Sequence, residues 1–441
     1  MTDIFIKDDL HPEDIAMLQA LYSRSPASVL SHLEKVREVG SGKFMDQYYV
    51  GYNHKSIGDC GTTTLFLEGI SMLAAKAIQA TPLYSGQEAS TRYLDMAKQP
   101  VLNPADTEEG SAIQNAWMDF YKSHMPAVVE HLKEKYPRQE GESKKQYDKA
   151  IHARSFDIMR GFLPAGCTTN ASWHTNLRQA WDHLSDLRHY PTQEVRDIAA
   201  ATLTDLQAQY PNSFNHKLYP EIEEYLSLCG DFFLYDTNVV CNEMIMEHSI
   251  GAMLSGFELY HEGGMIKWWD HPVVKDRPQF AKLPHILDSL GQVMYEFPLD
   301  FGSFRDLQRH RNGVCRMPLL STKHGFHAWY INNLPEDVRA KAIDLIGTQE
   351  QCISKLDIPE TEQQYYVAMG FNVACEVTRG LPGTVYLIEL RTAPTVHPTM
   401  RQVAQDMGIY LKKAFPNLTL HADMSPDTWS IRRGGQDIET K

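Results

Sequence analysis

A polar stretch between positions 85 and 93 is the first place where this sequence could do chemistry. Glu88, Ser90 and Arg92 alternate there, so a carboxylate, a hydroxyl and a guanidinium are crowded together. If the stretch opens a helix, the backbone N–H groups and Arg92 would form an anion site, with Ser90 as a further donor. Ordinary surface residues around a helix N-cap would produce the same pattern, so both interpretations stand.

A second stretch, residues 305–311, reads Arg-Asp-Leu-Gln-Arg-His-Arg. A guanidinium binds phosphate through two hydrogen bonds and stacks on flat rings, so these arginines could clamp a phosphate. An exposed basic loop is the alternative. His324 and His327 lack an acidic residue at ligand spacing, so we predict no metal site. No arrangement of Cys with His or Ser with His indicates a protein nucleophile.

The longest pattern in the chain occurs twice, in residues 186–212 and 389–417. Each copy has an acid-Leu-Arg, a Pro-Thr, an arginine and an aromatic-Pro-Asn in the same order. The recurring arginines are Arg188 with Arg391, and Arg196 with Arg401. Each copy also predicts an amphipathic helix between its Pro-Thr and its final proline. The apolar faces consist of Val195, Ile198, Ala199, Thr202 and Leu206 in the first copy, and Met400, Val403, Ala404, Met407 and Leu411 in the second. We interpret the pattern as a duplicated domain.

Local patterns predict the elements around these residues. We expect a β-strand at 62–67 and another at 292–297, and a polar loop entering a helix at 84–93. Residues 159–175 suggest a loop or short strand, and residues 212–220 a linker. Helices are expected at 12–21, 27–39, 71–79, 221–228, 242–256, 302–310 and 335–355.

The totals exclude several classes of protein. The 441 residues include 42 Lys and Arg against 56 Asp and Glu, a net charge of −14 that argues against non-specific binding to nucleic acid or anionic membranes. The most apolar window, 65–78, is too short to span a bilayer. The seven scattered cysteines fit free thiols in a reducing compartment. Acidic residues within the first ten argue against a signal peptide. We therefore expect a cytoplasmic protein.

Together the motifs resemble those of the flavin-dependent thymidylate synthases, the ThyX family. The first half contains a His-x-Ser at His54 and Ser56, and a Glu-x-Ser-x-Arg-Tyr at 88–93. It also contains an Arg-x-x-Leu-Pro that begins at Arg160, an Asn-x-Arg at 176–178 and a Leu-Arg at 187–188. The family's Arg-His-Arg is absent from this half, where Ala-Thr-Pro stands at 80–82, and occurs in the second half at 309–311.

The resemblance implies an α/β (α+β) fold with two tandem ThyX-like domains, each a small mixed sheet flanked by helices. The domains would span 1–215, with a helical insertion at about 97–155, and 216–441. Because neither half carries the whole signature, we expect one composite site and one vestigial site. The composite site would combine Glu88, Ser90, Arg92, Arg160 and Arg188 with Arg309, His310 and Arg311.

In this family a one-carbon unit passes from methylene-tetrahydrofolate to C5 of dUMP, with FAD as cofactor and NADPH as reductant. The resemblance implies that Arg92 and Arg160 hold the nucleotide, together with Glu88 and Ser90. Arg188 would be catalytic, stabilising charge on the N3–O2 side of the uracil ring. The flavin would be held by His54, Ser56, Glu88, Asn176, Arg178, Arg309, His310 and Arg311.

Two alternatives remain open: a related enzyme that modifies another pyrimidine nucleotide, and a non-catalytic relative that binds a nucleotide or serves as a scaffold. In the family the site is shared within a tetramer, so a tandem chain is expected to form a homodimer with four ThyX-like domains. We also expect that Arg92→Ala or Arg188→Ala abolishes nucleotide binding while the fold remains intact.

Overall fold

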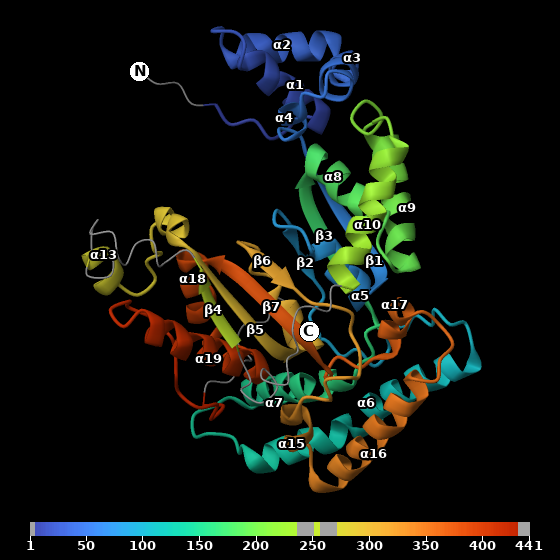
Figure 1. The fold of residues 1–441 in the computed structure, drawn as a ribbon, viewed down its shortest axis with the longest axis vertical. Helices are drawn as coiled ribbons and strands as arrows, with labels where there is room; N and C mark the ends of the chain where they lie inside the picture. The colour runs from blue at the N-terminus through green and yellow to red at the C-terminus, as the bar shows by residue number, and fades with distance from the viewer. Residues whose placement is uncertain (1–4, 236–250, 256–270, 431–441) are drawn as a thin grey trace. The chain divides into compact units, whose positions relative to one another are not determined.

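The computed structural model describes residues 5–235, 251–255 and 271–430 (Figure 1). The chain forms two compact units. Unit 1 comprises Met1–Ile70, Ala74–Glu88 and Asn170–Phe233, and unit 2 comprises Ser71–Leu73, Ala89–Thr169 and Leu234–Lys441. Residues 89–169 of the first predicted domain therefore belong to the same compact unit as most of the second. The predicted boundary at 215 describes the repeat, and it does not coincide with the boundary between the units.

Unit 1 combines a small sheet with short helices. Its first helices follow from local signals: Pro12 begins α1, Ser28 caps α2 through its hydroxyl, and Gly40 ends α2 with a φ of 68°. The sheet has the strand order β1-β3-β2. The elements are α1 (Pro12–Tyr22), α2 (Val29–Val39), α3 (Gly42–Phe44), the π-helix η1 (Met45–Gly51), α4 (Lys55–Gly58), β1 (Thr62–Ser71), α5 (Met72–Gln79), β2 (Ser85–Glu88), β3 (Thr168–Asn176), α8 (Leu177–Leu187), α9 (Gln193–Gln209) and α10 (Pro220–Tyr235).

Unit 2 is built around a sheet with the order β4-β5-β7-β6, in which every neighbouring pair is antiparallel. Long helices from the expected insertion, α6 (Glu108–Lys135) and α7 (Lys144–Met159), belong to this unit. The remaining elements are η2 (Arg160–Phe162), β4 (Gly251–Ser255), α13 (Pro272–Lys275), η4 (His285–Leu290), β5 (Gln292–Asp300), α14 (Phe301–Leu307), β6 (Val314–Arg316), α15 (Ala328–Asn332), α16 (Glu336–Ile353), α17 (Glu360–Gln363), η5 (Gln364–Tyr366), β7 (Asn372–Gly380), α18 (Leu381–Arg391) and α19 (Pro398–Ala414).

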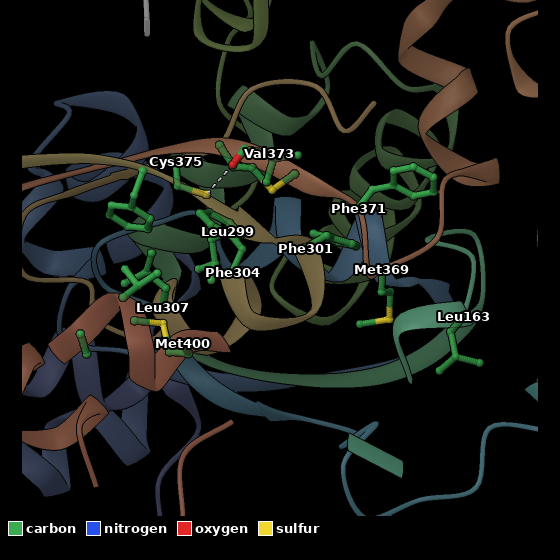
Figure 2. Close-up of a cluster of buried hydrophobic side chains, with 14 of the residues drawn as sticks. Leu163, Leu299, Phe301, Phe304, Leu307, Met369, Phe371, Val373, Cys375 and Met400 are labelled. Carbon is green, nitrogen blue, oxygen red and sulfur yellow. Dashed lines mark hydrogen bonds between the residues drawn. The ribbon is translucent and has the colours of Figure 1, made fainter. Parts of the chain in front are cut away.

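The core of unit 2 lies between this sheet and the helices packed on it. Alternate residues of β5, including Phe297 and Leu299, are buried, as expected for a strand with one face in the core. Figure 2 shows Leu299 beside Phe304 of α14 and Val373 of β7. This packing fixes α14 against the sheet, and α14 carries several residues of the site described below.

The structure repeats the same sequence of elements in both halves of the chain. The order β1–α5–β2, then η2–β3–α8–α9, returns as β5–α14–β6, then η5–β7–α18–α19. The strand orders β1-β3-β2 and β5-β7-β6 are the same. The fold class, α/β with small sheets flanked by helices, is confirmed. The predicted apolar faces of α9 and α19 are confirmed as well, because their residues join the cores of the two units.

The recurring arginines on α9 and α19 have a structural role in both copies. Arg196 donates hydrogen bonds to the carbonyl oxygens of Tyr190 and Pro191, at 2.7 and 2.8 Å. Arg401 donates to the carbonyl oxygen of Thr392, at 2.8 Å. Each arginine therefore ties its helix to the turn that precedes it, which explains the recurrence without a ligand.

Some predicted elements differ from the structure. Residues 84–93 do not open a helix: Ser85–Glu88 form β2, which pairs with β3, and a turn follows. A Cβ atom at Gly86 would collide with the carbonyl oxygen of Ser172, so only glycine lets the strands approach this closely. The helix predicted at 242–256 lies mostly outside the described residues, and Gly251–Ser255 form a strand. Among the described helices, none has the length and apolar character needed to cross a membrane.

Candidate functional site

A buried carboxylate in unit 2, Asp306 near the end of α14, is surrounded by arginines. Its Oδ2 lies 4.0 Å from Nη1 of Arg160, and its Oδ1 lies 3.9 Å from Nε of Arg309. Burial by itself raises the pKa of a carboxylate, yet the pKa of Asp306 is lowered by the charges of Arg92, Arg160, Arg309 and Arg391. These four guanidinium groups come from distant parts of the sequence, and they converge around one negative charge.

Arg92 reaches this cluster from the turn after β2. Its guanidinium pairs with Asp157 of α7 through two hydrogen bonds, Nε to Oδ1 at 2.7 Å and Nη2 to Oδ2 at 3.1 Å. Nη2 also donates to the carbonyl oxygen of Thr395, at 3.3 Å. The Arg92 side chain keeps 14% of its surface exposed, whereas Asp157 keeps 2%. Asp157 therefore holds Arg92 in one orientation, and part of the Arg92 side chain stays accessible.

Arg160 belongs to a buried polar network. Its Nη2 donates to Ser303 Oγ at 3.0 Å. Ser303 Oγ also lies 3.2 Å from His397 Nδ1 and 2.7 Å from Thr399 Oγ1. Burial, followed by the charge of Arg160, lowers the pKa of His397 well below its ordinary value, so this histidine is neutral. The network fixes Arg160 between α14 and the segment that leads into α19.

Arg391, the last residue of α18, is held by a neutral histidine. Its Nε donates to Nε2 of His310 at 2.7 Å. Burial, and next the charge of Arg391, lowers the pKa of His310 to about 2. His310 must then carry its single proton on Nδ1 and accept at Nε2. No carboxylate in the described part of the chain lies within ion-pair distance of Arg391, so its charge is available to a ligand.

The cluster carries more positive than negative charge. Arg379 lies beside it and donates to the carbonyl oxygen of His310 at 3.2 Å. Among the described residues, the aspartates that act on Arg160 are Asp157, Asp300 and Asp306. The four arginines that lower the pKa of Asp306 thus outnumber these three aspartates. An excess of guanidinium groups, some of them partly exposed, is the arrangement that binds phosphate and other oxyanions.

Arg188, the predicted catalytic residue, lies in unit 1 and has a different environment. It forms an ion pair with Glu223 of α10, with Nη2 to Oε1 at 3.0 Å. The neighbouring His189 contacts the other carboxylate oxygen of Glu223, also at 3.0 Å. Within its own unit the charge of Arg188 is therefore already compensated. The unit 2 cluster contains Arg391, its counterpart in the repeat.

The predicted flavin residues are divided between the two units. In unit 1 the side chains of His54 and Ser56 are exposed. Asn176 caps α8 by accepting from the backbone N–H of Gln179 at 2.8 Å, and Arg178 pairs with Asp59 at 2.6 Å. The two groups best suited to bind a flavin phosphate are thus occupied within the unit. Arg178 nevertheless keeps 29% of its side-chain surface exposed, so it could hold a flavin phosphate together with the exposed His54 and Ser56.

The remaining predicted residues lie at the edges of these clusters. Glu88 accepts from Gln79 Nε2 at 2.8 Å, in unit 1. Ser90 Oγ accepts from the backbone N–H of Arg92 at 3.3 Å, so its hydroxyl shapes the turn that carries Arg92. Arg311 Nη1 donates to the carbonyl oxygen of Arg309 at 3.4 Å. Of the predicted residues, the structure places Ser90, Arg92, Arg160, Arg309, His310 and Arg311 in unit 2. Arg92, Arg160 and Arg309 act directly on Asp306.

Sequence reasoning missed the carboxylates and the buried network. Asp306 stood inside the basic stretch 305–311 but was not singled out, and Asp157 stands three residues before Arg160. A signal was present in both cases, because a carboxylate beside clustered arginines is expected to orient them. Ser303, His397 and Thr399 carried no such signal, since only the packing of α14 against the segment before α19 brings them together.

The fold and the site define an α/β protein with an arginine-rich cluster, built from duplicated elements. The sequence model of the family described as thymidylate synthase complementing protein matches residues 8–212. Over these residues the chain is similar to that family, which confirms the resemblance predicted from the motifs. The match covers just under half of the chain and includes Arg92, Arg160 and Arg188.

Three relatives match the chain over most of its length, at 22–24% identity. A UPF0159 protein of Chlamydia muridarum is 24% identical over 427 residues, which cover 84% of this chain and 79% of the relative. A UPF0159 protein of Chlamydia pneumoniae is 23% identical, with 82% and 76% covered. A UPF0159 protein of Thermoplasma acidophilum is 22% identical, with 92% and 94% covered. The chain is thus similar to these proteins along most of its length, including the half that the family model does not match.

Proposed function

We propose that the Asp306 cluster binds the phosphate of a pyrimidine nucleotide such as dUMP. The observation that carries this proposal is the convergence of Arg92, Arg160, Arg309 and Arg391 on one buried carboxylate. A nucleotide monophosphate carries about two negative charges at neutral pH. It would therefore match the surplus of guanidinium groups, because these groups form strong charge-assisted hydrogen bonds with phosphate oxygens.

The arginines of the cluster would have different roles in binding, because their exposure and their hydrogen-bond partners differ. Arg160 is 2% exposed and is held by Ser303, so it would contribute positive electrostatic potential to the site without contacting the ligand. Arg309 is 48% exposed and would reach the phosphate directly. Arg391 has its Nε committed to His310, which leaves both Nη groups for the ligand. Arg391 would then take the role that the motif assigned to Arg188, beside the N3–O2 edge of the uracil ring.

We further propose that the reaction is the family's transfer of a one-carbon unit from methylene-tetrahydrofolate to C5 of dUMP. FAD, reduced by NADPH, supplies the hydride and the carbon transfer when it is bound. The contribution of this chain would be to position the nucleotide and to stabilise charge on its ring. The similarity of residues 8–212 to the family supports this reaction.

A non-catalytic or partly vestigial relative is the second candidate. The specific observation in its favour is the ion pair between Arg188 and Glu223, together with the internal bonds of Asn176 and Arg178. A unit whose candidate ligand groups are satisfied internally has no evident need of a ligand. For this second candidate, unit 1 would have only a structural role, and the cluster in unit 2 would bind the nucleotide.

Titration calorimetry with dUMP, and with inorganic phosphate as a second probe, tests the proposed site. Arg92→Ala should reduce affinity by about tenfold to 100-fold, since a charge-assisted hydrogen bond contributes ~1.5–3 kcal/mol. Arg138→Ala removes an exposed arginine of the same unit and should leave affinity unchanged. Equal affinities for the wild type and both variants would refute the site.

Reconstitution with FAD separates the two candidates. Purified protein that binds FAD, shows flavin absorbance and forms dTMP from dUMP, methylene-tetrahydrofolate and NADPH would support the enzyme. Protein that binds dUMP but neither takes up FAD nor forms dTMP would support the binding protein.

We also propose that the chain forms a homodimer, in which two copies provide four ThyX-like domains. The repeated strand order of the two halves supports this arrangement, because each chain then provides two related domains. Sedimentation velocity should give a mass of twice the 50.3 kDa chain. A single species at the mass of one chain would contradict the proposal.

A further inference from the structure

Residues 423–429 form a segment without helix or strand that contacts α19 at its start and α7 at its end, and we call it the C-terminal strap. Arg401 of α19 pairs with Asp423, Nη2 to Oδ1 at 3.2 Å, and donates to Ser425 Oγ at 3.1 Å. Gln405, also on α19, donates to the carbonyl oxygens of Asp423 and Ser425, at 3.0 and 2.9 Å. Side chains of α19 therefore hold the start of the strap in unit 2.

The end of the strap holds Arg154 of α7. Asp427 Oδ2 accepts from Arg154 Nη2 at 2.8 Å. The guanidinium carbon of Arg154 lies over the ring of Trp429, 5.7 Å from its centroid, and over the ring of Trp329 of α15, at 5.1 Å. Arg154 keeps only 5% of its side-chain surface exposed. Its contacts with the two rings are therefore largely shielded from water, which strengthens a cation–π interaction.

Trp429 adopts a backbone conformation that a bulky residue disfavours. Its φ of 50° lies in the left-handed region. The backbone N–H of Trp429 donates to Asp427 Oδ1 at 3.2 Å, and its buried ring meets the ring of Tyr136 at a centroid distance of 4.8 Å. Such a conformation persists only where the surrounding contacts hold it. The bend brings the carboxylate of Asp427 and the ring of Trp429 to the same guanidinium.

Arg154 is close to the residue that orients Arg92. It stands three residues before Asp157 on α7, so the two side chains lie on the same face of the helix. Asp157 holds Arg92 through two hydrogen bonds. A second path leads to the same place, because the Trp329 ring lies 4.7 Å from the ring of His397, whose Nε2 donates to the carbonyl oxygen of Asp157 at 3.2 Å. Through Arg154 the strap therefore acts on the turn of α7 that carries Asp157.

Helix α7 has its own anchors in the core of unit 2. Tyr147, Ile151 and Ile158 are buried in the hydrophobic cluster of that unit, and the hydroxyl of Ser143 caps the first turn. These contacts explain why the helix forms. The strap adds a carboxylate and an aromatic ring to one cation in the turn before Asp157, and this contact bears on the orientation of that turn.

We propose that the C-terminal strap positions Arg92 for the anion. Asp427 and Trp429 hold Arg154, Arg154 fixes the turn of α7 that carries Asp157, and Asp157 keeps the guanidinium of Arg92 in place. The two strap residues are positioning residues and contact no ligand. The proposal rests on the proposed nucleotide site, so its test includes a measurement that needs no nucleotide.

NMR of the arginine side chains provides that measurement. In full-length protein with isotope-labelled arginine, the Nε–H signal of Arg92 is assigned by its loss in Arg92→Lys. This proton should exchange slowly with water in the wild type, because it is bonded to Asp157. Trp429→Ala should raise its exchange rate by about threefold to tenfold, because a shielded cation–π contact is lost. Trp429→Phe keeps a ring for Arg154 and should restore slow exchange.

Two further variants and an internal control complete this experiment. Asp427→Asn keeps the shape of the side chain, removes its charge and should also raise the exchange rate, which provides a second test if Trp429→Ala fails to fold. Thr428→Ala changes an exposed neighbour in the strap and should have no effect. The Nε–H of Arg178, which donates to Asp59 within unit 1 at 2.6 Å, should be unchanged in every variant.

Titration calorimetry with dUMP then tests whether this positioning affects binding. Trp429→Ala should lower the affinity by about threefold to tenfold, as expected for a residue that acts without contacting the ligand. When Arg92→Ala is already present, Trp429→Ala should cause no further loss, because the residue that it positions is gone. With Arg309→Ala the two losses should multiply, because Arg309 has no printed role in the strap's path to Arg92 and sites without shared partners are additive.

Two results would overturn the proposal. One is an unchanged exchange rate of the Arg92 Nε–H in folded Trp429→Ala and Asp427→Asn proteins. The other is an equal loss of dUMP affinity from Trp429→Ala in the presence and in the absence of Arg92. If the wild type binds no dUMP while the Arg92 signal responds to both variants, the nucleotide site is refuted and the control of Arg92 by the strap is supported.

Discussion

The repeated arginines Arg188 and Arg391 occupy the same place in two copies of one motif, yet they are held in opposite ways. Arg188 lies 3.0 Å from Glu223 and is neutralised by it. Arg391 donates to His310, which burial keeps neutral, and it retains its full charge. The comparison indicates that the first copy uses Arg188 to attach helix α10. The second copy keeps Arg391 without a carboxylate partner among the described residues.

A second contrast, with the roles of the two copies reversed, concerns the residues that begin the two 3-10 helices. Arg160 begins η2 and is charged, whereas Gln364 begins η5 and satisfies its amide with the backbone of Leu320 and Thr361. Both lie in unit 2, so the repeat places one copy with an electrostatic function beside one with a packing function. An unsatisfied charge is costly to maintain, and a site that preserves it is a better candidate for ligand binding than its neutralised counterpart.

The largest effect is expected from Arg160→Met. This change removes a guanidinium that is 2% exposed and leaves Asp306 buried with less compensation. Breaking a buried ion pair from one side costs about 3–5 kcal/mol of the free energy of unfolding, measured by urea denaturation. Gln364→Leu, at the corresponding place, removes only neutral hydrogen bonds and should cost about 1–3 kcal/mol. Equal losses for the two variants would remove the distinction between the copies.

The second effect concerns nucleotide binding. Arg391→Ala should lower the affinity for dUMP by about tenfold to 100-fold, because a charge-assisted hydrogen bond of ~1.5–3 kcal/mol is lost. Arg188→Ala should change the affinity by less than about threefold, since its charge is already paired with Glu223. This expectation reverses the one based on the motif alone, in which Arg188 binds the nucleotide. If Arg188→Ala has the larger effect, the motif was the better guide and the cluster is not the site.

The sequence could predict these elements better than their pairing. Helices α9 and α19 and strand β5 followed from apolar periodicity, since such patterns report local packing faces, and strand β1 followed from the β-propensity of its residues. Strand β2 was missed because Ser85–Glu88 contains no apolar residue and is specified by its pairing with β3. The motifs grouped Arg92 and Arg160 with Arg309, and the structure brings these three residues together around Asp306, while their predicted roles stay predictions. The choice between Arg188 and Arg391 could not be made, because it depends on Glu223, 35 residues away on another helix.

The third effect compares two histidines, His310, which is buried in unit 2, and His183, which is partly exposed in unit 1. Burial of its ring lowers the pKa of His183 to about 4. In both cases the unfolded chain binds the proton more tightly than the folded protein does. Their contribution to stability is therefore complete above pH 6.5 and is lost as the pH falls below it, down to about 4 for His183 and about 2 for His310.

His310→Gln keeps an acceptor for Arg391 but cannot titrate. Between pH 6 and 4.5 its free energy of unfolding should fall less steeply than that of the wild type, by about 1.4 kcal/mol per pH unit for one proton. His183→Gln should show a similar reduction in this range and none below pH 4. Urea denaturation at several pH values measures both. An unchanged slope for His310→Gln would mean that His310 is not held neutral.

The smallest effect distinguishes a structural from a ligand-binding role for Asn176. Its side chain caps α8, whereas the N-cap position of α18 is Gly380, where a Cβ would collide with Asp288 and which has no side chain to cap the helix. Asn176→Ala should therefore cost about 1 kcal/mol of the free energy of unfolding. Asn176→Asp retains the cap and should cost less, although it would place a negative charge near any bound phosphate. If FAD binds the wild type and both variants equally well, Asn176 serves only α8. If Asn176→Asp folds normally but loses FAD, the flavin does lie beside this helix, and unit 1 is more than a vestige of the duplication.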